Sequence, residues 1–67
     1  MSITVKQARV GANLTIREMA ARLGQHEQTY SKYEKHPEKM PVEMAERIAE
    51  ITGVPMDDLI FLPNRSN

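Results

Sequence analysis

Four polar side chains share one face of a short helix predicted over residues 27–35, and all four can form hydrogen bonds. Glu27, Gln28, Ser31 and Lys32 are spaced by one and four residues, so a helix places them side by side. They offer a carboxylate acceptor, an amide that donates and accepts, a hydroxyl and an ammonium donor. On this chemistry alone, a solvated surface is the better interpretation, because most surface helices have such a face.

The residues before this face predict how it is positioned. Thr15 and Glu18 form a capping box, in which each side chain satisfies a free backbone amide at a helix start. An apolar stripe at helical spacing follows and should face inward: Ile16, Met19, Ala20 and Leu23. Gly24 ends this helix, because glycine tolerates the left-handed backbone that a sharp stop needs. The polar helix then places Tyr30 and Tyr33 inward, so the sequence predicts a helix-turn-helix.

Further helices are predicted on both sides of this unit. Thr4 and Gln7 form another capping box, which opens a first helix that ends near residue 11 or 12. Pro41, at the first helical position, and Gly53, after the last, bound a fourth helix. Its inward positions are Val42, Met44, Ala45, Ile48, Ala49 and Ile51. A short fifth helix is predicted around residues 57–61, with two aspartates in its first turn, where the helix dipole favours negative charge.

The predicted fold class is therefore all-α, a compact five-helix domain with a helix-turn-helix. Residues 1–67 form a single domain, with its core at about 3–61 and a short C-terminal tail at 62–67. At 67 residues the domain is near the size at which a single hydrophobic core is only marginally stabilising.

Composition argues against several functional classes. The chain has no cysteine and no apolar run long enough to cross a membrane, and it shows no export signal, so a cytoplasmic location is expected. It also lacks a phosphate-cradling glycine-rich loop and the Ser/His/Asp spacing of a hydrolase, so an enzyme is not expected. His26 and His36, ten residues apart, fit no compact ligand pattern, and neither a metal nor a cofactor is expected.

The charge is balanced overall but divided along the chain. Nine basic and nine acidic residues give a formal net charge of zero, whereas nucleic-acid-binding domains are more often basic. Residues 1–40 hold seven Lys or Arg against four Glu, and residues 41–67 hold two against five acidic residues. The half with the predicted helix-turn-helix could therefore still present a basic face. The same division also suits a protein partner.

Residues 15–35 resemble the helix-turn-helix of the Cro and lambda-repressor-like (XRE-type) family, and the resemblance extends over about residues 3–61. It rests on small Ala20 between the helices, Leu23 in the core, the turn Gly24 and the pair Tyr33-Glu34. Three positions depart from the usual pattern. Gln25 replaces a common Val, Tyr30 replaces an Ile or Val, and Ile16 replaces a Gln that often meets phosphate.

This resemblance implies a lambda-repressor-like DNA-binding domain whose partner is double-stranded DNA. The polar face Glu27, Gln28, Ser31 and Lys32 would then meet base edges in the major groove. The expected phosphate contacts around it are Thr15, Arg17, Gln25, His26, Lys35 and Lys39. The resemblance also implies a partly buried structural ion pair between Arg9 and Glu34.

The end of the predicted core leaves two interpretations open. Ile60, Phe61 and Leu62 cannot all face one small interior, so they could form an exposed patch that contacts another chain. Alternatively, Leu59 and Phe61 complete the core. The first interpretation allows a homodimer. The predicted function is a phage or prophage type of sequence-specific DNA-binding regulator. The alternative is a protein-binding modulator that keeps the repressor fold and binds another regulator, such as a partner repressor.

Overall fold

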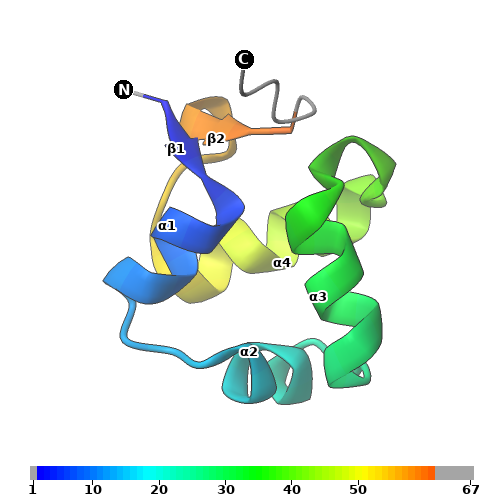
Figure 1. Cartoon of the computed structure of the whole chain (residues 1–67). Coiled ribbons are helices and arrows are strands. Elements are labelled where there is room, and N and C mark those ends of the chain that lie inside the picture. The colour runs from blue at the N-terminus through cyan, green and yellow to red at the C-terminus, as the bar shows by residue number, and fades with distance from the viewer. Residues whose placement is uncertain (1, 62–67) are drawn as a thin grey trace.

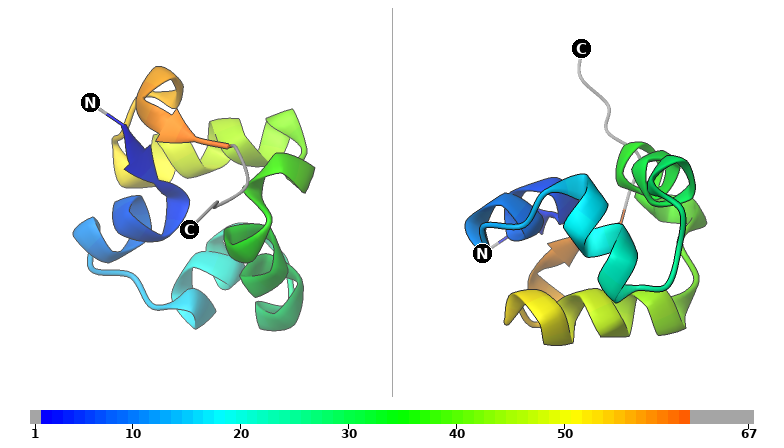
Figure 2. Two further views of the ribbon diagram at one scale, coloured as in Figure 1. Left: turned by 45° about the horizontal axis from the view of Figure 1, so that its top comes forward. Right: turned by 90° about the horizontal axis from the view of Figure 1, so that it is seen from below.

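In the computed structural model, which describes residues 2–61, four α-helices surround one small core (Figure 1). The helices are α1 (Val5–Gly11), α2 (Ile16–Arg22), α3 (Glu27–Lys35) and α4 (Val42–Thr52). Two 3₁₀ turns, Pro37–Lys39 and Met56–Asp58, follow α3 and α4, and two short strands are β1 (Ile3–Thr4) and β2 (Leu59–Ile60). From below, α4 runs along one side of the molecule, and α1, α2 and α3 lie on the other side (Figure 2).

Side chains cap the starts of α1 and α2 as the sequence predicts. The Thr4 hydroxyl accepts from the Gln7 amide at 3.0 Å, and the Thr4 amide donates to Gln7 Oε1 at 2.9 Å. Thr15 and Glu18 repeat this arrangement at 3.0 and 2.9 Å. The amide of Thr15 also holds the pKa of the Glu18 carboxyl below its usual range. Both starts are therefore fixed by residues three positions apart, independently of the packing.

Left-handed residues end the same two helices. After α2, Gly24 has a φ of 68°, and the Gln25 amide donates to the Ala20 carbonyl at 2.9 Å. After α1, Asn13 has a φ of 61°, and the Leu14 amide donates to the Arg9 carbonyl at 3.2 Å. Both are Schellman-type ends, which satisfy carbonyls that the helix itself leaves open. The turn between α2 and α3 therefore has a defined direction.

The two ends of the described chain pair with each other, which corrects the prediction of a fifth helix. Ile3 lies opposite Leu59 and Thr4 opposite Ile60 in a parallel pair. In place of a helix at 57–61, the chain makes one 3₁₀ turn and then enters β2. The reason is non-local: the chain after the turn runs alongside β1 and bonds to it, and two-residue strands are too short to show an alternating pattern.

All four α-helices and β2 contribute buried residues to the core. Its buried cluster consists of Val5, Ala8, Met19, Ala20, Tyr30, Met44, Ile48 and Leu59. Val42, predicted to face inward, is 68% exposed, because it begins α4 at its outer end, beyond the buried positions of that helix. Within residues 2–61, no helix is both long and apolar enough to cross a membrane.

Candidate nucleic-acid interface

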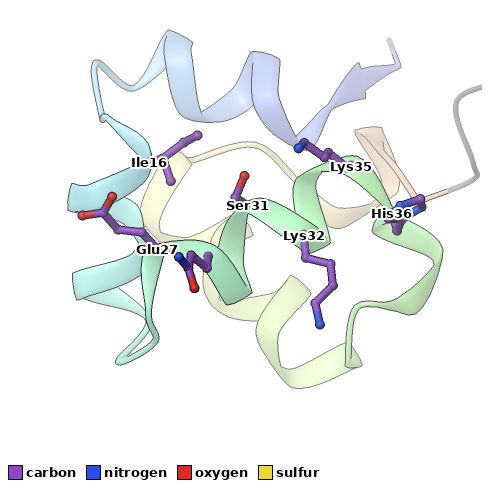
Figure 3. Close-up of a pocket in the computed structure, with 7 residues that line it drawn as sticks. Ile16, Glu27, Ser31, Lys32, Lys35 and His36 are labelled. Atoms are coloured by element: carbon purple, nitrogen blue, oxygen red, sulfur yellow. The ribbon is translucent and has the colours of Figure 1, made fainter.

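A groove of about 500 Å³ lies along the outer face of α3 and extends to the start of α2. Its lining residues are Ile16, Glu27, Gln28, Ser31, Lys32, Lys35 and His36. In Figure 3, Ser31 and Lys35 point to the top of the view and Lys32 to the bottom, and Ile16 stands at the start of α2. All four residues of the predicted polar face thus border one shallow, open surface.

Two tyrosines hold the opposite face of α3 against the domain. Tyr30 is fully buried, and Tyr33 is half-buried and packs against the core, so both face inward as predicted. Tyr30 and Tyr33 lie on one side of the helix, so Gln28 and Lys32, two residues before and after Tyr30, lie on the other side and are exposed. The orientation of the polar face is therefore set by the burial of Tyr30.

A buried ion pair fixes the C-terminal half of α3 to α1. Arg9 Nε lies 2.5 Å from Glu34 Oε2, and the two side chains are 9% and 7% exposed. Arg9 Nη1 also donates to the Leu14 carbonyl at 2.8 Å, and the hydrogen bond to Glu34 raises the pKa of Arg9. This guanidinium therefore joins α1, the turn after it and α3, and it remains charged.

The hydroxyl of Tyr30 lies in this same buried region. It faces Glu34 and Arg9. Burial, with a smaller effect of Glu34, raises the pKa of Tyr30, so the phenol stays neutral. The ring of Tyr30 therefore fills the core, and its hydroxyl is buried beside the Arg9–Glu34 pair.

A second, exposed ion pair crosses from α2 to α3 at the groove. Arg17 Nε lies 3.7 Å from Glu27 Oε1, and these side chains are 85% and 57% exposed. An exposed pair of this kind contributes at most about 1 kcal/mol to stability. Its more important effect is electrostatic, because Arg17 offsets the one carboxylate of the polar face that would repel phosphate.

Comparison with known protein families identifies the family to which this fold belongs. Residues 5–59 match the protein-family model described as Helix-turn-helix, which is most of the 67-residue chain. The chain belongs to this helix-turn-helix family. The family is of the XRE, or Cro and lambda-repressor-like, type. Membership implies a DNA-binding transcriptional regulator and not an enzyme. No curated protein and no solved structure gives a match.

The residues expected to flank DNA in this helix-turn-helix protein lie in different places. Lys35 lines the groove, and Arg17 pairs with Glu27, which also lines it. His26 precedes α3, and its side chain does not cap the helix. Lys39 is exposed in the 3₁₀ turn after α3. The Thr15 hydroxyl already accepts a hydrogen bond from the Glu18 amide. Of these residues, Lys35 lines the groove, and His26 and Lys39 lie just before and after α3.

Gln25 stands apart from that set. It borders a separate hollow formed with the start of α4, next to Leu23, Met44 and Arg47. Its Oε1 is buried and has no hydrogen-bond partner within the described residues. Arg47 spans the same region, since its Nη2 donates to the Arg22 carbonyl at 3.3 Å. The structure therefore does not bring Gln25 to the groove.

Two groove residues were not among the contacts expected from the sequence. His36 lies four residues after Lys32, so it continues the same helical face past the end of α3. The spacing could have indicated it, but the following Pro37 suggested a loop. Ile16 was assigned only to the inner stripe of α2, and its position at the groove depends on how α2 packs against α3.

The predicted patch at the end of the core is only partly described. Ile60 lies in β2, and Phe61 is half-buried and packs against the core, while Leu59 is buried. Leu62 lies outside the described residues. These positions fit completion of the core better than a continuous exposed patch.

Proposed function

We propose that this chain is a sequence-specific DNA-binding transcriptional regulator that places α3 in the major groove. The observation that carries the proposal is the two-sided character of α3. Its inner face is fixed by Tyr30 and by the Arg9–Glu34 pair, and its outer face presents polar groups along an open groove. A rigidly held, exposed helix is what major-groove readout requires.

The outer face has suitable chemistry for base edges. Gln28 can pair bidentately with adenine N6 and N7, and Lys32 can donate to guanine O6 and N7. Glu27 can accept from cytosine N4, and Ser31 can bond with several bases. We assign base contact to these four residues. The phosphates on either side of these bases then meet Arg17, His26, Lys35 and Lys39. The start of α2 at Thr15 lies near the DNA backbone.

Titration of DNA at two salt concentrations tests this function. If about three phosphates are neutralised, affinity should fall about 40-fold between about 50 and about 200 mM salt. The probe is a labelled duplex selected by the protein from a random-sequence pool, and a scrambled duplex of equal composition is the control. Binding that ignores salt, or treats both duplexes alike, contradicts sequence-specific regulation.

Arg17→Ala separates DNA contact from stability. The Arg17–Glu27 pair is exposed, so the melting temperature should stay nearly constant. Affinity should fall, and the slope of log affinity against log salt should decrease by about one, because one phosphate contact is lost and Glu27 is left uncompensated.

The matched control for this variant is Arg22→Ala, which removes an exposed cation from the other end of α2. Arg22 does not line the groove. An equal loss of affinity in both variants would show that only the overall charge matters.

Within this function, we propose a repressor of phage or prophage type that pairs as a symmetric dimer on two half-sites about one helical turn apart. A second candidate is a protein-binding modulator that acts on another regulator. The zero net charge and the carboxylate of Glu27 within the face favour it. Under this candidate, the protein should enrich no duplex from the random-sequence pool.

A further inference from the structure

Ile16 is the apolar member of an otherwise polar groove. The other six lining residues carry amide, hydroxyl, imidazole or charged groups. Ile16 is the first residue of α2 and is half-buried, so part of its side chain packs against the core and part remains accessible. Figure 3 shows it close to Glu27 and Ser31, at the opposite end of the groove from His36.

The exposed part of this side chain limits what it can contact. An isoleucine neither donates nor accepts a hydrogen bond, so against a phosphate it would only displace water. Among the base edges in the major groove, the C5-methyl group of thymine is the apolar one. A ligand that fills the groove therefore gains most from Ile16 when it places a thymine methyl there.

We propose that Ile16 is a specificity-determining residue that contacts a thymine methyl group beside the base read by the start of α3. This inference rests on the proposed DNA-binding function. It assigns one base of the selected duplex to a side chain outside α3. At that base, the protein would prefer a methyl group and would not read a hydrogen-bonding pattern.

The test replaces each thymine of the selected duplex, one at a time, with deoxyuridine. This change removes one methyl group and leaves every hydrogen-bonding group in place. At the position next to Ile16, the wild-type protein should bind about fourfold more weakly, which is the expected effect of one buried methyl group. With Ile16→Ala, the same replacement should have no effect.

A milder variant and a matched control complete this test. Ile16→Val removes a single methylene from the half-buried side chain and should retain part of the methyl effect, so it serves if Ile16→Ala lowers the melting temperature too far. Val10→Ala is the matched control, because Val10 is 54% exposed on α1 and does not line the groove. It should keep the full fourfold effect.

The outcomes distinguish failure of this inference from failure of the proposed DNA-binding function. If the wild-type protein binds the selected duplex but the Ile16 variants show the same deoxyuridine effects as wild type, another residue contacts the methyl group and the inference is wrong. If no thymine is sensitive in the wild type, it is also wrong. If the wild-type protein binds no duplex selectively, the proposed function and the inference fall together.

Discussion

Glu34→Ala is expected to lower the free energy of unfolding by about 3–5 kcal/mol, because it leaves the Arg9 guanidinium buried without its partner. Both side chains are less than 10% exposed, so the lone guanidinium would be poorly solvated. Total stability is commonly about 5–15 kcal/mol, and a domain of this size is near the lower end. Thermal melting followed by circular dichroism should therefore show a strongly reduced midpoint.

Two comparisons make this prediction specific. Glu46→Ala removes an exposed carboxylate from α4 and should change stability by no more than about 0.5 kcal/mol. The double variant Arg9→Met with Glu34→Leu should be more stable than Glu34→Ala alone, because it leaves no lone charge. It still removes the donor to the Leu14 carbonyl, so some loss remains. An unchanged melting temperature for Glu34→Ala would rule out the structural role.

Gln28→Ala is expected to relax specificity without unfolding the protein. A good bidentate pair with adenine discriminates against other bases by about 1–3 kcal/mol, which corresponds to about 5- to 150-fold in relative affinity. Gln28 is exposed on α3, so its truncation leaves the core intact. Competition between the selected duplex and single-base variants should show lost discrimination at one position and retained discrimination elsewhere.

Lys32→Ala should lose discrimination at a neighbouring guanine and should also weaken binding to all duplexes, because it removes a charge. Lys6→Ala is its matched control, since Lys6 is an exposed lysine on α1 that does not line the groove. A uniform loss in both variants, with the base preference unchanged, would mean that Lys32 contacts only phosphate and would contradict its assignment to a base contact.

The local features of this fold could be predicted from the sequence because neighbouring residues set them. Each capping box is formed by residues three positions apart, and Gly24 supplies a left-handed turn whatever surrounds it. The helical spacing of Tyr30 and Tyr33 predicted that Tyr30 faces the core, and it is buried there. These signals are sufficient to predict a helix-turn-helix and the helix over residues 27–35, whose bounds agree with α3.

Other features required the assembled chain. The β1–β2 pair joins residues 56 positions apart, so no local pattern distinguished Leu59–Ile60 from the start of a helix. The Arg17–Glu27 pair depends on the angle between two helices, as does the placement of Ile16 at the groove. Gln25, one residue beyond Gly24, is directed towards α4 by the end of the turn.

The sequence by itself determined the four α-helices and the apolar side of each, because backbone capping and periodicity act within a few residues. Only the tertiary structure decided which exposed side chains border the same groove, and that a strand pair closes the domain. Distances between side chains on different helices depend on packing, which no short stretch of sequence encodes.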